Sequence, residues 1–328
     1  MEKRSLGPLQ ISPLILGTWA LGGFMWGGAD EKASMEAINT SLDLGITTID
    51  TAPIYGEGLS EELIGRAIKG RTEGVVIATK CGIRTDTSEG TPWKVRKVDG
   101  VLLQLRINTT PESIFTEWER SAKRLGVDVI DLYQIHWPSD TTPVEESWSA
   151  MVSLKKQGKV RAIGVSNYNL AQLKKAHALY PVDSLQSPFS LVRRDIEKEL
   201  IPFCRKEGIA VLGYSPLERG LLTGHIGMDH PFPPGDLRPE KEIFEKNNRH
   251  LVLEALSLLK PLAKKYQVSL AELIIQATIA HPGITAALVG ARNLEQASQN
   301  AAALQLVLTA DERAFIESTL LKTPLKLS

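Results

Sequence analysis

Residues 129–167 read VIDLYQIHWPSDTTPVEESWSAMVSLKKQGKVRAIGVSN. A β-rich apolar run over Val129–Ile135 is followed by a helical pattern over Pro143–Gln157 and then by a second apolar run over Val160–Val165. Strand-like runs that alternate with helical patterns are typical of βα units in a parallel sheet. The stretch therefore predicts one strand–helix–strand unit. The number of such units in the chain follows from the sequence on either side of it.

The same alternation continues on both sides. It predicts eight strands: Leu14–Gly17, Ile46–Asp50, Val75–Thr79, Val129–Ile135, Val160–Val165, Ser184–Gln186, Ile209–Tyr214 and Ala286–Val289. Helices are expected at Asp30–Leu44, from a cap at Ser60 to Ile68, from Thr110-Pro111-Glu112 onward, and at Pro143–Gln157, Leu170–Ala178, Asp195–Glu207, Arg249–Tyr266, Ser269–Ala280 and Leu294–Ala303. Eight such units predict a (β/α)8 TIM barrel. A hairpin at Arg4–Ile11 precedes the barrel, and the Ala310–Leu320 helix is an addition outside the ring.

We expect one domain over residues 1–328, because α/β barrels often reach ~250 residues or more as one domain. The alternative architecture is a doubly wound sheet, which would carry G-x-G-x-x-G directly after its first strand. The pairs Gly22-Gly23 and Gly27-Gly28 do not fit that spacing, and Gly56-Glu57-Gly58 is followed by Glu61 where the third glycine belongs. The barrel is therefore favoured.

Composition limits the classes of partner. Lys plus Arg and Asp plus Glu both number 38, so the net charge is zero and no nucleic-acid role is expected. No apolar run approaches the ~18 residues of a membrane span. Two cysteines, Cys81 and Cys204, are too few for a disulfide framework. We expect a cytoplasmic protein; no metal motif is present, and the sequence does not predict the oligomeric state.

Polar residues stand where the predicted strands end, which is where barrels of this kind carry their chemistry. Asp50 ends the second strand, Lys80 follows the third and His136 follows the fourth, while Tyr55 lies five residues beyond Asp50. Taken singly, each has an ordinary structural explanation, such as a capping aspartate or a structural histidine. A carboxylate, a phenol, an amine and an imidazole at one rim are hard to explain by packing.

These four groups suit carbonyl reduction, which needs a hydride at carbon and a proton at oxygen. Tyr55 can donate the proton, although a phenol with an ordinary pKa of ~10 is a reluctant acid. A neighbouring Lys80 is expected to lower that pKa, and Asp50 to keep the lysine charged and in place. An N–H of His136 can hold the carbonyl oxygen and stabilise the developing alkoxide.

The chain resembles the aldo-keto reductases over nearly its whole length. The resemblance lies in six motifs that occur in the family's order: Leu16-Gly17-Thr18, Asp50-Thr51-Ala52 with Tyr55-Gly56, Ala78-Thr79-Lys80, Asp131-Leu132-Tyr133-Gln134-Ile135-His136, Gly164-Val165-Ser166-Asn167 and Tyr214-Ser215-Pro216-Leu217. The continuation Arg219-Gly220-Leu221-Leu222-Thr223-Gly224 resembles a bacterial branch that is also similar to potassium-channel β subunits.

The resemblance implies an NADP(H) cofactor. Ser166, Asn167 and Gln186 match positions that bind the nicotinamide carboxamide, and Tyr214 matches the aromatic residue that stacks on the ring. The other cofactor positions it implies are Gly17, Thr18, Trp19, Ser215, Pro216, Leu217, Arg219, Gly220, Leu221, Gly290, Arg292, Gln296 and Asn300. An arginine beside a glycine-rich turn also suits a diphosphate on physical grounds.

The region after the eighth strand departs from the common family pattern. Gly290 stands where many members carry a lysine for the 2′-phosphate, and Gln296 stands at a usual arginine position. Arg292 is the one cation left, as in a Gly-Ala-Arg variant of the branch in which Arg and Gln contact the phosphate and Asn contacts the adenine. A preference for NADP(H) over NAD(H) is expected on this resemblance.

The substrate is less constrained. Trp19, Trp26 and Trp137 follow the first or fourth strand and are candidates for an apolar pocket, although core packing is an alternative for Trp19. The stretch from Gly82 to Asn108 is expected to be a long loop with the charged residues Arg84, Asp86, Lys94, Arg96 and Arg106. It either covers the site and selects polar substrates or is only a solvated insertion. Sugar-like aldehydes, methylglyoxal-type dicarbonyls and aromatic aldehydes all remain open.

Two other functions fit parts of the pattern. Lys80 could form a Schiff base in a barrel aldolase, in which case borohydride would trap substrate on it. An adjacent Asp50 that keeps the amine charged argues against a nucleophilic lysine. The third possibility is an NADP(H)-sensing regulatory subunit with little turnover, which would show slow reduction of every aldehyde and a stable partner complex.

Overall fold

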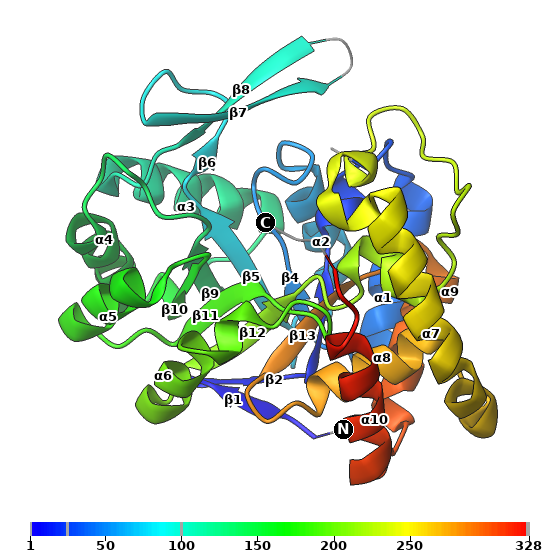
Figure 1. Cartoon of the computed structure of the whole chain (residues 1–328). Coiled ribbons are helices and arrows are strands. Elements are labelled where there is room, and N and C mark those ends of the chain that lie inside the picture. The colour runs from blue at the N-terminus through cyan, green and yellow to red at the C-terminus, as the bar shows by residue number, and fades with distance from the viewer. Residues whose placement is uncertain (1, 24–25, 99–100, 326–328) are drawn as a thin grey trace.

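A computed structural model describes residues 2–23, 26–98 and 101–325. Its centre is a closed barrel of eight parallel strands (Figure 1). In ring order the strands are β3 (Leu14–Gly17), β4 (Thr48–Asp50), β5 (Val76–Cys81), β9 (Ile130–Ile135), β10 (Val160–Ser166), β11 (Ser184–Pro188), β12 (Ala210–Tyr214) and β13 (Ala286–Gly290). β13 pairs with β3 and closes the ring. The predicted barrel is confirmed.

Helices surround the barrel and bury an apolar face against it. They are α1 (Glu31–Asp43), α2 (Leu59–Ile68), α3 (Pro111–Leu125), α4 (Val144–Lys156), α5 (Leu170–Leu179), α6 (Leu200–Glu207), α7 (Lys246–Tyr266), α8 (Leu270–Ile279), α9 (Leu294–Ala302) and α10 (Ala310–Leu321). α3 begins as the sequence predicts, because Thr110 caps the Ser113 amide and Pro111 occupies the first turn. No helix within the described ranges is long and apolar enough to cross a membrane.

The N-terminal hairpin closes one end of the barrel. β1 (Arg4–Leu6) pairs antiparallel with β2 (Leu9–Ile11), as predicted. Leu6, Leu9 and Ile11 are buried with the inward side chains of the barrel strands. This apolar plug leaves the opposite end, where the strands have their C-termini, for polar groups.

The Gly82–Asn108 stretch is not the loop that the sequence predicted. It folds into β6 (Ile83–Arg84), β7 (Thr91–Val98) and β8 (Val101–Ile107), a three-stranded antiparallel sheet. In Figure 1 the β7–β8 hairpin projects at the end of the barrel opposite β1 and β2. Leu105 and Ile83 pack in a small apolar cluster with Ile54, so the hairpin has a core contact of its own.

Two helix predictions are also wrong in detail. Ser60 does not cap α2, because the helix begins at Leu59 after Gly58, whose φ of 104° is left-handed. The predicted helix over Asp195–Glu207 is two pieces, the short η2 (Asp195–Glu197) and α6. Pro202 lies in the first turn of α6, where its missing N–H costs nothing, and the same proline would disrupt one continuous helix.

Candidate active site

A cavity of about 610 Å³ lies at the C-terminal ends of the barrel strands. Nearly all predicted site residues line it: Gly17, Thr18, Trp19, Trp26, Asp50, Tyr55, His136, Trp137, Ser166, Asn167, Gln186, Tyr214, Ser215, Pro216, Leu217, Arg219, Gly220, Gly290, Arg292, Gln296 and Asn300. Trp19 therefore borders the cavity and does not belong to the barrel core. Residues far apart in the sequence meet here because they lie at or just beyond the C-terminal ends of neighbouring barrel strands.

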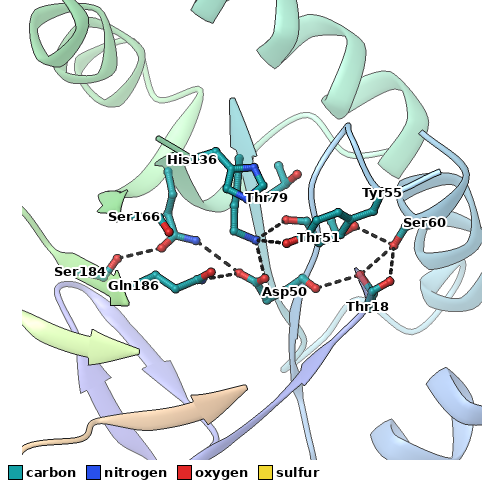
Figure 2. A network of polar contacts seen from close by, with 12 residues as sticks. Thr18, Asp50, Thr51, Tyr55, Ser60, Thr79, His136, Ser166, Ser184 and Gln186 are labelled. Atoms are coloured by element: carbon teal, nitrogen blue, oxygen red, sulfur yellow. Dashed lines mark hydrogen bonds and ion pairs between the residues drawn. The ribbon is translucent and has the colours of Figure 1, made fainter. Parts of the chain in front are cut away.

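Lys80 and Asp50 form a buried ion pair beside Tyr55. Figure 2 shows Asp50 and Tyr55 within this network of polar contacts. Lys80 Nζ lies 2.5 Å from Asp50 Oδ1 and 3.4 Å from the Tyr55 hydroxyl, and it also donates to the Thr51 carbonyl at 2.9 Å. The Lys80 side chain is fully buried and does not line the cavity. The lysine therefore lies behind Asp50 and Tyr55 and acts on the cavity through them.

The pKa directions at this trio are set by burial and by the lysine charge. Burial lowers the pKa of Lys80, but Asp50 and Tyr55 outweigh it and the net pKa is raised, so the ammonium form is favoured. Burial raises the pKa of Tyr55, and the Lys80 charge offsets only part of that increase. The expected lowering of the Tyr55 pKa is therefore wrong in its net direction, although the lysine contribution has the predicted sign.

Amides fix the second carboxylate oxygen of Asp50. Gln186 Nε2 donates to Asp50 Oδ2 at 2.8 Å, and Gln134 Nε2 lies 3.4 Å from the same oxygen. Gln134 is fully buried, and Gln186 is largely buried although part of it lines the cavity. Asp50 thus keeps one oxygen for Lys80 and one for the amides, which holds the lysine at a defined place.

The loop that carries Tyr55 is held against the chain after β3. Ser60 Oγ lies 2.7 Å from Thr18 Oγ1 and 2.9 Å from Thr51 Oγ1, and Thr18 Oγ1 donates to the Asp50 carbonyl at 2.9 Å (Figure 2). Gly22 permits this approach, because a Cβ there would lie 2.5 Å from the Tyr55 carbonyl carbon. Ser60 therefore positions the tyrosine loop in place of the capping role predicted for it.

His136 completes the polar floor. Its ring meets the Tyr55 ring edge-on, with centroids 5.9 Å apart. Burial and the nearby Lys80 charge hold the pKa of His136 well below its ordinary value, so its imidazole is neutral at physiological pH. A neutral imidazole can donate one hydrogen bond but is a far weaker acid than imidazolium.

Four non-glycine residues near the ends of β10 and β12 have left-handed backbone conformations. Asn167, Ser215, Glu218 and Arg219 have φ between 45° and 61° without being glycine. Such strain is typical of functional sites. The Tyr214 hydroxyl donates to Asn167 Oδ1 at 2.8 Å, which joins the ends of the two strands.

Arg219 and Arg292 bring cations to this side of the cavity. Arg219 Nε is buried with no hydrogen-bond partner in the described part of the chain, and burial lowers the Arg219 pKa. Arg292 donates to the Trp26 and Gly28 carbonyls at 3.3 and 2.9 Å, and its own amide donates to Gln296 Oε1 at 2.9 Å. An unpaired buried guanidinium nitrogen beside a cavity suits an anionic ligand such as a phosphate.

Comparison with known proteins identifies the family. The model of the aldo/keto reductase family matches residues 13–320. The chain belongs to this family. It is an oxidoreductase that reduces carbonyl groups with a nicotinamide nucleotide.

Several relatives of this aldo/keto reductase cover most of its length. The aldo-keto reductase YhdN of Bacillus subtilis (strain 168) is 41% identical over 287 residues, 87% of this chain and 82% of the relative. A protein named NADH-specific methylglyoxal reductase, of Escherichia coli (strain K12), is 38% identical over 94% of this chain and 95% of its own. The structure of glycerol dehydrogenase AKR11B4 from Gluconobacter oxydans superposes with a TM-score of 0.87 at 35% identity, covering 98% of this chain and 96% of that one.

One predicted cofactor residue of this aldo/keto reductase lies elsewhere. The Leu221 side chain is fully buried in the core between the barrel and its helices, and it does not line the cavity. The apolar character of leucine explains the difference: in the short η3 (Glu218–Thr223), Leu221 and Leu222 turn inward while Arg219 and Gly220 face the cavity.

Sequence reasoning missed several lining residues of the aldo/keto reductase cavity. The hairpin contributes Trp93, Lys94, Arg96 and Leu105. The segment between β12 and α7 adds Thr223, His225, Ile226, His230, Leu237, Arg238 and Lys241. These residues come from a hairpin that was expected to be a loop and from a stretch without periodicity, so the strand-end argument could not find them.

Proposed function

We propose that this enzyme reduces small aldehydes and ketones to alcohols with NADPH, with Tyr55 as the proton donor. The observation that carries the proposal is the contact between the Tyr55 hydroxyl and the buried Lys80–Asp50 ion pair at the floor of the cavity. When bound, NADPH supplies the hydride. We also propose that the enzyme works in the cytoplasm, where its two buried thiols, Cys81 and Cys204, stay reduced.

In the proposed reaction the Tyr55 hydroxyl donates a proton to the carbonyl oxygen as the oxygen gains negative charge. The phenolate that remains is stabilised by the Lys80 ammonium, which stays charged because Asp50 raises its pKa. His136 supports the same oxygen through a neutral N–H. Lys80 is fully buried and Tyr55 is half-buried, so their electrostatic interaction lies in a medium less polar than water and is stronger there.

The polar groups on the β10–β12 side of the cavity suit a nicotinamide carboxamide. Gln186 uses its Nε2 for Asp50 and keeps Oε1 as an acceptor. Asn167 uses Nδ2 for the His136 carbonyl and for Ser166 Oγ, and its Oδ1, which already accepts from Tyr214, can accept a second hydrogen bond. The Tyr214 ring, which also lines the cavity, offers an apolar face for the nicotinamide.

The phosphate-binding residues that we propose are Arg219 for the diphosphate and Arg292 with Gln296 for the 2′-phosphate, with Asn300 beside the adenine. Arg219 has the unpaired nitrogen described above. Asn300 Nδ2 donates to the Gly290 carbonyl at 3.1 Å and keeps its oxygen as an acceptor. The relative from E. coli is named NADH-specific, so the preference for NADPH needs a test of its own.

The function is tested by aldehyde-dependent loss of the absorbance of reduced nicotinamide. A panel of glyceraldehyde, methylglyoxal and benzaldehyde, each with NADPH and with NADH, covers the three substrate types left open by the sequence. We expect rapid consumption of NADPH with at least one aldehyde and slower consumption of NADH. A folded protein that binds NADPH and reduces none of these or of wider aldehydes would instead support a cofactor-sensing role.

Arg292→Ala is expected to weaken NADPH binding about 10- to 100-fold and NADH binding much less, since a hydrogen-bonded charge pair contributes ~1.5–3 kcal/mol. Dissociation constants for both nucleotides, from nicotinamide fluorescence, check this. Arg292 also holds the Trp26 and Gly28 carbonyls, so some loss common to both nucleotides is expected. Arg292→Lys, which keeps the charge, is the control. Equal losses for NADPH and NADH would mean that Arg292 only braces this loop.

A further inference from the structure

Three cations line the outer part of the cavity, beyond the ends of the barrel strands. Lys94 and Arg96 come from β7 of the projecting hairpin, and Lys241 comes from the junction of η4 (Arg238–Glu240) and η5 (Glu242–Phe244). We call Lys94, Arg96 and Lys241 the outer cations. The hairpin pair and Lys241 are far apart in the sequence and meet only across the cavity.

The outer cations lack carboxylate partners. Within the described part of the chain, no Asp or Glu oxygen lies within ion-pair distance of any of the three. Other cations, such as Arg84, Arg120 and Arg238, do pair with carboxylates. Arg96 Nε is buried without a hydrogen-bond partner among the described residues, and Arg96 Nη1 donates only to the carbonyl of the adjacent Val95. All three side chains are half-buried, so water does not fully solvate their charges.

The pKa shifts of the two lysines also indicate that positive charge among the outer cations is not balanced. The pKa of Lys94 is lowered first by burial and then by the charges of Lys241, Arg96 and Arg219. The pKa of Lys241 is lowered by burial, Arg219 and Arg96, and Glu240 opposes this only as the weakest influence. Like charges that repel one another in a half-buried wall are relieved when an anion binds between them.

An apolar wall connects the outer cations with the reacting groups. The rings of Trp93 and Trp137 lie 5.2 Å apart, and Trp137 directly follows His136 in the sequence. Leu105 and Ile54 pack in the same cluster, and Lys94 Nζ lies 4.0 Å from the centre of the Trp93 ring. A ligand with its carbonyl at Tyr55 would therefore extend along aromatic surface toward Lys94.

We propose that Lys94, Arg96 and Lys241 bind an anionic group, a carboxylate or a phosphate, carried by the carbonyl substrate on its far side from the carbonyl. This inference rests on the proposed function and narrows its substrate class to anionic, partly apolar aldehydes and ketones. The charge of Arg219, the residue proposed for the coenzyme diphosphate, contributes to the lowered pKa of both Lys94 and Lys241. The coenzyme diphosphate is therefore the competing anion for the outer cations, and the test distinguishes it from an anionic substrate.

The test uses two substrates of matched shape, 4-formylbenzoate and its neutral methyl ester, with NADPH as coenzyme. We expect wild-type kcat/KM to favour the carboxylate, and the preference to shrink as ionic strength rises, because salt screens partly exposed charges. Lys94→Met, Arg96→Gln and Lys241→Met should each lower the carboxylate-to-ester ratio about tenfold, the equivalent of ~1.4 kcal/mol. Lys156→Met, an exposed lysine at the end of α4, is the matched control and should keep the wild-type ratio.

Two results would overturn the proposal. The first is a wild-type ratio near one that salt does not change. The second is that the variants weaken NADPH binding and lower kcat/KM equally for the carboxylate and the ester. That result would assign the outer cations to the coenzyme. If neither aldehyde is turned over, the dissociation constants of the two compounds in the presence of NADPH, from quenching of tryptophan fluorescence, still measure the preference. Absence of turnover would contradict the proposed reductase function, and the ratio of the two dissociation constants would then support or overturn the anion site.

Discussion

Tyr55→Phe is expected to lower kcat for carbonyl reduction by roughly 10²–10⁴-fold, the usual contribution of a positioned general acid. The substitution removes only the hydroxyl that lies 3.4 Å from Lys80 Nζ. Neither of its described neighbours replaces it as an acid. The His136 imidazole is already neutral because its pKa is held well below the ordinary value, and Lys80, whose pKa is raised, does not line the cavity. Steady-state kinetics with the best aldehyde of the panel measures the effect.

The phenylalanine ring should preserve the rest of the site. Tyr55 stacks on Trp19 with ring centroids 6.4 Å apart and meets His136 edge-on, and both contacts depend on the ring. NADPH affinity and the melting temperature should therefore remain close to the wild-type values. If Tyr55→Phe kept most of the wild-type kcat, another group would have to supply the proton and the proposed mechanism would be wrong.

The barrel could be predicted from the sequence because its strands are short apolar runs at regular intervals between helical patterns. The hairpin could not be recognised by that criterion, although a different signal was present. Trp93 and Val95 alternate with Lys94 and Arg96, as expected for a half-exposed strand. The charged side chains suggested a solvated loop, but in the hairpin Lys94 and Arg96 line the cavity and the apolar Val95 is the exposed side chain.

The floor of the site could be predicted because parallel strands bring their C-terminal ends together. Asp50 ends β4, Lys80 lies near the end of β5 and His136 follows β9, so the three meet for this reason. The net direction of the Tyr55 pKa could not be predicted, because it depends on how completely the phenol is buried. The sequence also did not predict which side chains of the short η3 turn inward: Leu221 was expected at the coenzyme but packs in the core. The catalytic and coenzyme roles of these residues remain predictions.

Lys80→Met is expected to impair both stability and catalysis. It removes the partner of a carboxylate that is 2% exposed, and breaking a buried ion pair on one side costs ~3–5 kcal/mol of unfolding free energy. Gln186 and Gln134 remain near Asp50, so part of the carboxylate is still hydrogen-bonded. Catalysis should fall by at least about 10²-fold, because burial then raises the Tyr55 pKa without opposition from the lysine and the phenol becomes a weaker acid.

The double variant Asp50→Asn/Lys80→Met separates the two effects. Replacing both charges removes the uncompensated carboxylate, so unfolding free energy measured in denaturant should recover most of the loss, since buried pairs contribute little net stability over neutral replacements. The Gln186 amide, which donates to Asp50 in the wild type, can still donate to the side-chain oxygen of the asparagine that replaces it. Activity should remain low, because no positive charge stabilises the phenolate. Recovery of wild-type kcat together with stability would mean that the ion pair only supports the fold; a stable but slow enzyme would mean that the Lys80 charge acts on Tyr55 during proton transfer.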